Sequence, residues 1–305
     1  MLPVIRVLAP NPSVYTLEGT NTFVVGDGPV VVIDPGPDDA AHLEEVEAVA
    51  TSVGPVGAVL VTHDHPDHAP GAARLAWSVG APLYAFRLAG AEHLRDGQRL
   101  SVGALEVIAV HTPGHTSDHV AFHVPRDGAL FTGDAVLGRG TSFIDPPDGD
   151  LGQYLRSLTR MLELAPRTIY PGHGPVVLRA EATLQKYLDH RARREEQVLA
   201  AMAHGGATVS AMVADIYADY PPQVHELAAR SVLAHLLKLE AEGRATKRGR
   251  GAKASWSAST PRPCGRCGKP AKGRGRYCES CSVVMLQEGG WPETAGEADP
   301  ADPEV

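Results

Sequence analysis

Residues 61–71 read VTHDHPDHAPG, and the six from His63 to His68 are three histidines, two aspartates and a proline. Such a run is a poor helix former and cannot be buried as apolar core. Imidazole and carboxylate groups are, however, the ligands that zinc accepts. The H-x-H spacing of His63 and His65 lets one loop direct two imidazoles at a single ion, and the adjacent Asp67 and His68 can turn toward a second. The stretch therefore predicts a metal site that needs further ligands from elsewhere in the chain.

Three short motifs later in the chain offer such ligands. They are HTPGHT with His115, FTGDAV with Asp134 and YPGHG with His173. Each of these residues follows a predicted strand and lies beside a glycine, which lets the backbone approach an ion closely. The sequence has no G-x-S-x-G motif that would argue for a serine nucleophile. We therefore expect the chemistry to depend on metal.

The first half of the chain reads as strands separated by turns and short helices. TFVVG (22–26) and VVVID (30–34) flank the turn signal Asp27-Gly28-Pro29 and predict a hairpin. GAVLVT (57–62) is a short apolar run that predicts a buried strand leading directly into the histidine stretch. Helices are predicted from PGPDDAAHLEEVEAVATSVG, APGAARLAWSVG and LGQYLRSLTRMLEL. This alternation over about 180 residues implies a layered α/β architecture.

From Glu181 the pattern changes to helices. The second of three helical segments has Thr208 as its cap, the third stops at Gly243, and RATKRGRGAKASWSAS then predicts a basic hairpin. Three helices followed by a hairpin are typical of a winged helix. The alternative is a helical appendage that packs on the catalytic body or on a second subunit. Nucleic-acid binding and homodimer formation are both compatible with this segment.

The run from His63 to His68, with His115, Asp134 and His173 downstream, resembles the five-motif pattern of the metallo-β-lactamase superfamily. Asp34 in VVVIDPG matches its first motif, and the resemblance covers residues 1 to about 180. It implies an αββα sandwich with the site at one edge of the two sheets. It also implies a hydrolase in which two Zn²⁺, or similar divalent ions, share a hydroxide nucleophile.

The resemblance further implies a role for each site residue. One metal ion would be bound by His63, His65 and His115, and the other by Asp67, His68 and His173. Asp134 would bridge both ions, and Asp34 and Thr62 would orient ligands. The candidate catalytic residues are Asp134, Asp67 and His119, of which His119 in TSDH matches a recurrent family position.

Several longer stretches resemble one subgroup, the lactamase-beta-like endoribonucleases, which act on single-stranded RNA. They are NPSVYTLEGTNTFVVG, HTPGHTSDHVAF, FTGDAVLGRGTSFIDPP, IYPGHGPV and YLDHRARREEQVL. The winged-helix segment is similar to that subgroup as well, so the resemblance extends to about residue 258. Glyoxalase II enzymes share HTPGHT, which makes a thioester or ester hydrolase the main alternative. A nucleic-acid-binding protein with a vestigial hydrolase domain and a mononuclear iron enzyme are further alternatives.

Charge is distributed unevenly along the chain. Its formal net charge is −8, but eleven basic residues and no acidic one lie between Arg244 and Arg276. The rest of the chain holds 17 basic and 36 acidic residues, a formal charge of −19. A compact basic segment on an acidic body predicts either a docking region for a polyanion such as RNA or a solvated basic linker.

The four cysteines form two C-x-x-C pairs separated by ten residues: Cys264, Cys267, Cys278 and Cys281. Two such pairs can wrap four thiolates around one structural Zn²⁺, which then supplies the folding energy of a small ribbon. Five Lys and Arg residues and Tyr277 within the ribbon would suit a phosphate backbone and a stacked base. A protein-binding role is the alternative.

The predicted organisation is a catalytic domain over 1–183, a winged-helix domain over 184–258, a zinc ribbon over 259–284 and an acidic disordered tail over 285–305. No apolar run approaches the ~20 residues of a membrane span. The N-terminus, MLPVIRVLAPNP, has neither a signal-peptide nor a transit-peptide layout. We therefore expect a cytoplasmic protein without a membrane partner.

Overall fold

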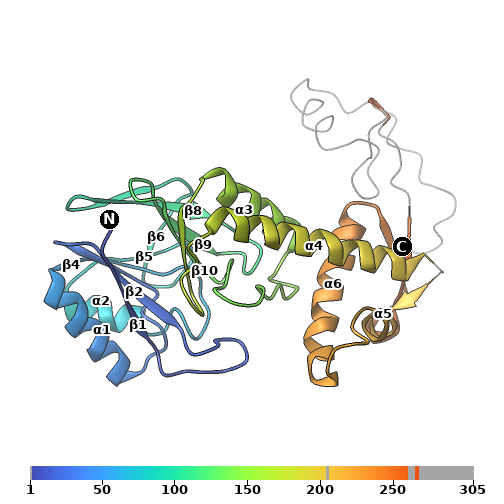
Figure 1. Cartoon of the computed structure of the whole chain (residues 1–305), viewed down its shortest axis with the longest axis horizontal. Helices are drawn as coiled ribbons and strands as arrows, with labels where there is room; N and C mark the ends of the chain where they lie inside the picture. The colour runs from blue at the N-terminus through green and yellow to red at the C-terminus, as the bar shows by residue number, and fades with distance from the viewer. Residues whose placement is uncertain (1, 204–205, 260–264, 268–305) are drawn as a thin grey trace. The chain divides into compact units, whose positions relative to one another are not determined.

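The structure is a computed structural model that describes residues 2–203, 206–259 and 265–267 (Figure 1). The chain forms two compact units. The first holds the residues up to Glu196 together with Glu226–Ala234, and the second holds Gln197–His225 and the chain from His235 onward.

The first sheet of the first unit has six strands in the order of the sequence. Its first three strands are antiparallel, as expected for the hairpin around Gly28, and the next three continue in parallel. Helices α1 (Ala40–Val53) and α2 (Ala72–Val79) make the parallel crossovers. The strands are β1 (Val4–Leu8), β2 (Asn21–Val25), β3 (Val30–Ile33), β4 (Val56–Leu60), β5 (Leu83–Ala85) and β6 (Glu92–His93).

The second sheet has five strands in the order β11-β10-β9-β8-β7. All neighbours are antiparallel except β10 and β11, which are parallel because α3 (Leu151–Glu163) connects them. The strands are β7 (Arg99–Val102), β8 (Leu105–His111), β9 (Val120–Val124), β10 (Ala129–Gly133) and β11 (Thr168–Pro171). The long helix α4 (Ala180–Met202) follows.

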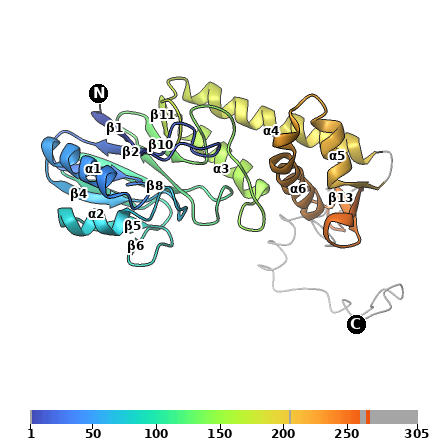
Figure 2. The same cartoon turned by 90° about the horizontal axis from the view of Figure 1, so that it is seen from below.

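Figure 2 shows these elements from below. Apolar side chains fill three layers between them. Between the sheets, Phe131 packs edge-on against Phe23 and stacks on Tyr170, with ring centroids 5.4 and 4.8 Å apart. The outer face of the first sheet packs on α1 and α2, and that of the second packs on α3 and α4. The predicted αββα sandwich is therefore confirmed.

The second unit contains a three-stranded sheet with the order β12-β14-β13. Thr208 caps α5 (Val209–Ile216) by accepting a hydrogen bond from the Ala211 amide, as predicted. Helix α6 (His225–Ala241) ends before Gly243, whose φ of 72° is left-handed. The buried Trp256 anchors the hairpin of β13 (Ala245–Arg248) and β14 (Ser255–Ala258), and β12 is Ala207–Thr208. The winged-helix fold is confirmed.

Some elements differ from the sequence-based expectation. Strands β1, β6, β7 and β12 were not predicted. Strands β6 and β12 have only two residues each, β7 has only four, and β1 has a single buried side chain and no regular alternation. The segment VSAMVADIYADY was expected to be helical up to Pro221-Pro222, but α5 ends at Ile216. No helix among the described residues is long and apolar enough to cross a membrane.

The predicted zinc ribbon and acidic tail lie almost entirely outside the described residues. Of the four cysteines only Cys267 is described, and it is exposed, whereas Cys264, Cys278 and Cys281 lie outside. The ribbon and its structural zinc therefore stay a prediction.

Candidate metal centre

Four strand ends bring the ligand-type residues together at one edge of the sandwich. The loop with His63 to His68 follows β4 of the first sheet, whereas His115, Asp134 and His173 follow β8, β10 and β11 of the second. Two backbone hydrogen bonds join the sheets at this edge, from the Val120 amide to the Thr62 carbonyl and from the Asn21 amide to the Gly172 carbonyl, each 2.8 Å long.

The structure gathers the seven predicted ligands into two groups. We call His63, His65, His115 and Asp134 the first group, and Asp67, His68 and His173 the second group; within each, the ligand atoms lie within 4.8 Å of one another. In the first group, His65 Nδ1 lies 2.9 Å from His63 Nε2 and 3.2 Å from His115 Nε2. In the second, His173 Nε2 lies 3.1 Å from Asp67 Oδ2 and 3.3 Å from His68 Nε2.

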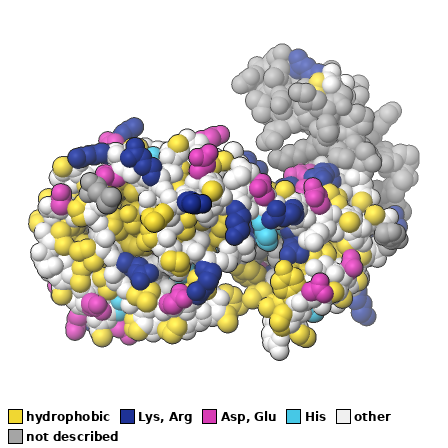
Figure 3. Space-filling model, viewed as in Figure 1, with side chains coloured by type: hydrophobic (Ala, Val, Ile, Leu, Met, Phe, Trp, Pro, Cys, Tyr) yellow, Lys and Arg dark blue, Asp and Glu magenta, His cyan; other side chains and the backbone are white. Residues whose placement is uncertain are grey.

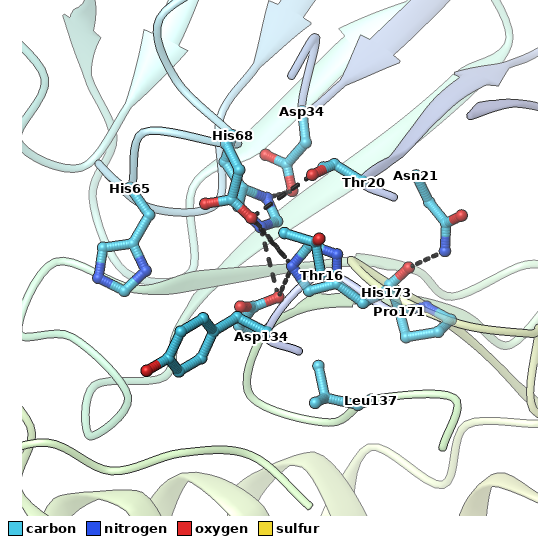
Figure 4. Close-up of polar contacts among 12 residues, drawn as sticks. Thr16, Thr20, Asn21, Asp34, His65, His68, Asp134, Leu137, Pro171 and His173 are labelled. Atoms are coloured by element: carbon cyan, nitrogen blue, oxygen red, sulfur yellow. Dashed lines mark hydrogen bonds and ion pairs between the residues drawn. The ribbon is translucent and has the colours of Figure 1, made fainter. Parts of the chain in front are cut away.

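Asp134 contacts both groups. Its Oδ2 is 3.7 Å from His115 Nε2, and its Oδ1 is 3.2 Å from His173 Nε2 and 3.4 Å from His68 Nε2. Figure 4 shows His68, Asp134 and His173 directed toward one another. This position between the groups is the one that a bridging carboxylate requires.

Hydrogen bonds on the far side of each ring fix which nitrogen faces the centre. The Nδ1 of His115 donates to the Phe143 carbonyl at 2.7 Å, and the Nδ1 of His173 donates to the Gly19 carbonyl at 3.2 Å. The Nδ1 of His68 donates to Asp34 Oδ2 at 2.9 Å. Because Nδ1 carries the proton in each case, Nε2 presents its lone pair to the centre.

Asp34 orients ligands of both groups, as the sequence predicted. Besides holding His68, its carboxylate accepts from the Thr62 amide at 2.7 Å and from the Thr62 hydroxyl at 2.8 Å. That hydroxyl then accepts from His63 Nδ1 at 3.0 Å. Asp34 has a φ of 51°, a region that non-glycine residues rarely adopt outside functional sites.

The donor set fits divalent metal ions. Imidazole lone pairs that converge at about 3 Å repel one another unless a cation lies between them. The buried Asp134 Oδ1 has no hydrogen-bond partner of good geometry among the described residues. Three imidazoles with one carboxylate, and two imidazoles with another, are combinations that zinc accepts.

Burial and neighbouring charges shift the pKa values of ligand histidines in opposite directions in the two groups. Burial lowers the pKa of His63 well below its usual value, and it lowers that of His65 as well. Burial acts in the same direction on His173, but the adjacent carboxylates of Asp134 and Asp67 outweigh it and raise the pKa of His173 to about 9. In Asp134, the charges of His68 and His173 outweigh burial and hold the pKa of the carboxyl well below its usual range. The carboxylate is therefore ionised and able to offset cationic charge.

Two glycines let backbone approach the centre. A Cβ on Gly172 would lie 2.6 Å from Asp134 Oδ1 and 2.7 Å from His68 Cε1. A Cβ on Gly133, whose φ is 44°, would lie 2.5 Å from the Thr62 hydroxyl. Both positions therefore require glycine.

His119 lies behind the first group. Its side chain is buried, its Nδ1 is 2.9 Å from the Thr112 hydroxyl, and its ring centroid is 5.1 Å from that of His63. Its Nε2 is buried without a hydrogen-bond partner within the described part of the chain, and burial lowers the pKa of the ring well below its usual value. The catalytic roles of His119, Asp67 and Asp134 stay predictions.

Sequence reasoning missed several residues that position the site. The Thr20 hydroxyl lies 3.4 Å from Asp67 Oδ2. The side-chain Nδ2 of Asn21 donates to the carbonyls of Pro171 and Gly174, each at 2.9 Å. The signal for both was the polar run Thr20-Asn21-Thr22 at the start of the buried strand β2, since buried polar groups need partners.

Comparison with known proteins gives the family. The Metallo-beta-lactamase superfamily matches residues 15–173, and the Beta-lactamase associated winged helix domain matches residues 208–256. The chain therefore belongs to the metallo-beta-lactamase superfamily and is a metal-binding hydrolase of that fold.

Relatives match more than three quarters of the chain. It is 34% identical over 269 residues to the Beta-lactamase-like protein 2 homolog of Drosophila melanogaster, covering 79% of this chain and 89% of that protein. It is also 34% identical over 248 residues to an Atrochrysone carboxyl ACP thioesterase of Aspergillus chevalieri, covering 77% and 79%. A Beta-lactamase domain protein from Burkholderia ambifaria has the same fold, with a TM-score of 0.73, 22% identity and coverage of 85% and 91%.

Proposed function

We propose that the chain is a dinuclear metal-dependent hydrolase and that its substrate is an acyl thioester. The observation that carries the dinuclear proposal is Asp134, whose two oxygens face the two ligand groups. We assign one ion to His63, His65 and His115, a second to Asp67, His68 and His173, and Asp134 to both. Two such ions supply a hydroxide nucleophile near neutral pH and stabilise negative charge on the substrate oxygen.

Zinc is the metal that the donor set favours, because it accepts imidazole and carboxylate alike. We assign a further structural zinc to Cys264, Cys267, Cys278 and Cys281. With four thiolates and no open position, that ion would have no part in catalysis.

The proposed reaction is hydrolysis of the C–S bond. The oxygen of water bonds to the thioester carbonyl carbon, the bond from that carbon to sulfur breaks, and a proton from water passes to the thiolate. The products are a carboxylic acid and a thiol. Asp67, whose side chain is 23% exposed, is the more open carboxylate of the second group and would orient the water.

The residues around the centre support a substrate that is not a polyanion. Asp118 accepts a hydrogen bond from the Asp64 backbone amide at 3.0 Å, and Asp148 accepts one from the Ser117 backbone amide at 3.3 Å, so that two carboxylates lie at the His115 loop. The guanidinium of Arg139 is paired with Glu18 at 2.6 Å. Lys and Arg side chains are scattered among hydrophobic and acidic ones on the face of the two-sheet body in Figure 3. The relatives named ACP thioesterases support the same substrate class.

Single-stranded RNA is a second candidate, favoured by the winged helix. Its β13–β14 hairpin exposes four cations, Lys247, Arg248, Arg250 and Lys253. Such a cluster would bind phosphates in a salt-dependent manner. The resemblance to the lactamase-beta-like endoribonucleases supports this candidate as well.

A substrate panel tests the proposal. Zinc-loaded full-length protein would be assayed on an acyl N-acetylcysteamine thioester, labelled single-stranded RNA and double-stranded RNA, with Asp134→Ala as the inactive control. We expect metal-dependent release of thiol and no RNA cleavage. RNA cleavage that is lost in Asp134→Ala and weakened in a Lys247→Ala/Arg248→Ala variant, without thiol release, would reverse the ranking of the two substrates.

A further inference from the structure

We propose that Val14, Tyr15 and Phe143 form a lip beside the metal centre that binds the apolar acyl group of the substrate. This inference deepens the proposed function and rests on it. It starts from two loops, Ser13–Gly19 and Ser142–Asp145, each of which supplies a backbone carbonyl to one ligand group. The Gly19 carbonyl accepts from His173 at 3.2 Å, and the Phe143 carbonyl accepts from His115 at 2.7 Å.

The two loops also meet each other. The rings of Tyr15 and Phe143 have centroids 6.4 Å apart and planes inclined at 49°. Beside them, the Glu18 carboxylate pairs with Arg139 at 2.6 Å, and Leu17 lies against Gly174, the neighbour of ligand His173. The aromatic pair therefore joins the loop that holds His173 to the loop that holds His115.

The apolar side chains of the lip are exposed to solvent to a large extent. Val14 is 82% exposed and Tyr15 is 58% exposed, whereas Phe143 is half-buried. Single exposed apolar residues are ordinary on a protein surface. Tyr15 and Phe143 lie against each other, and Val14 adjoins Tyr15 in the chain, so together they offer apolar area that a ligand can cover and remove from water.

Hydrogen bonds hold both loops in place before any ligand binds. The Ser13 hydroxyl accepts from the amides of Tyr15 and Thr16 at 3.1 and 3.0 Å, and the Ser13 amide donates to the Leu17 carbonyl at 3.2 Å. In the other loop, the carbonyl of Ser142 accepts from the buried guanidinium of Arg191. A surface fixed in this way loses little conformational entropy on binding.

The chemistry of the lip selects the ligand. None of its three side chains carries a charge, and the phenol of Tyr15 adds a single polar tip to an aromatic face. The neighbouring carboxylates of Asp118 and Asp148 disfavour an anionic group. An uncharged aliphatic or aromatic acyl chain fits these properties, with its carbonyl directed at the metal centre.

Matched thioesters test the lip. Propionyl and 3-phenylpropionyl N-acetylcysteamine share the same thiol and a similar carbonyl, and differ in the phenyl group. We expect wild-type zinc-loaded protein to prefer the phenyl compound in kcat/KM. Tyr15→Ala and Phe143→Ala should each lower kcat/KM for that compound by roughly tenfold, mainly through KM. Turnover of the propionyl compound should change by less than about twofold.

Trp77→Ala, which removes an 86% exposed aromatic side chain from α2, is the matched control and should leave kcat/KM for both substrates unchanged.

A second readout separates the lip from the proposed function. If wild-type protein hydrolyses neither thioester, calorimetry of zinc-loaded protein with 3-phenylpropionate and propionate still tests the lip. Tighter binding of the phenyl carboxylate, lost in Tyr15→Ala, would support the lip while the thioesterase proposal failed. Equal losses on both thioesters, in variants whose melting temperature is unchanged, would contradict the lip. Loss of RNA cleavage in Tyr15→Ala without loss of acyl discrimination would show that the rings stack a base, and this would also overturn the proposal.

Discussion

The two ligand groups of the metal centre differ in how the fold holds them. In the second group, His68 and His173 are almost completely buried, and their rings are oriented by Asp34 and by the Gly19 carbonyl. In the first group, His65 and His115 are half-buried, and His115 is oriented by a carbonyl of the loop that also carries Phe143. Both imidazoles of the second group are therefore buried, whereas only His63 of the first group is buried and its other two imidazoles are half-buried, with His115 held by a surface loop.

This difference predicts which substitutions affect one ion and which affect both. Asp134 and Asp34 connect to both groups, Gly172 lies against the second group and Asp134, and Arg191 acts on the first group alone through Ser142.

Asp134→Asn should have the largest effect. Loss of the shared carboxylate charge removes several kcal/mol of stabilisation at the metal centre, so we expect kcat/KM to fall about 10³-fold or more. Metal analysis should show fewer ions in both groups. Retention of full activity would contradict the bridging role of Asp134.

Asp34→Ala should come next. It removes the partner of His68 and, through Thr62, that of His63. Because orienting partners of metal ligands typically contribute 10–100-fold, we expect losses of about this size in metal affinity. Competition with a chromogenic chelator should show both ions weakened. A selective loss from one group would mean that the path through Thr62 carries no coupling.

Gly172→Ala should affect the second group more than the first. The added Cβ would meet Asp134 Oδ1 and His68 Cε1 at less than 3 Å, so the ligands must shift, with a destabilisation of about 1–3 kcal/mol. Thermal unfolding and metal titration check this. Gly28→Ala is the control, because a Cβ there would meet nothing within 4 Å. An unperturbed melting temperature in Gly172→Ala would contradict the close approach.

Arg191→Met should have the smallest effect and should be confined to the first group. It removes the donor to the Ser142 carbonyl, so the loop that holds His115 becomes looser. We expect the ion of the first group to bind about tenfold more weakly at most, and the affinity of the second group for its ion to stay unchanged. Arg191→Lys keeps a cation and should recover part of the loss. A loss of affinity shared equally by both ions would contradict the division between the groups.

The ligand groups could be predicted from the sequence because they depend on local features. His63 to His68 follow an apolar strand, and each later ligand follows a strand and adjoins a glycine, so that parallel strand ends bring them together. The hairpin around Gly28 and the caps at Thr208 and Gly243 are local in the same way.

The missed features depend on tertiary contacts. Strand β6 has two residues and exists because β5 pairs with it. The carbonyls of Gly19 and Phe143 are backbone groups, which residue identity does not reveal. Arg191 reads as one of several arginines of a surface helix, and only the fold buries it against Tyr154 and Ser142. The domain boundaries predicted near residues 183 and 258 stay predictions, although α4 and α6 each contribute to both compact units.

Metal stoichiometry tests the central claim most directly. A Cys264→Ser/Cys267→Ser variant of the full chain removes the predicted ribbon site and leaves the sandwich intact. After metal removal and zinc titration, mass spectrometry of the native protein should show two ions per chain in this variant and one more in the wild type. A single ion per chain in the variant, above all a single iron in protein as purified, would contradict the dinuclear account.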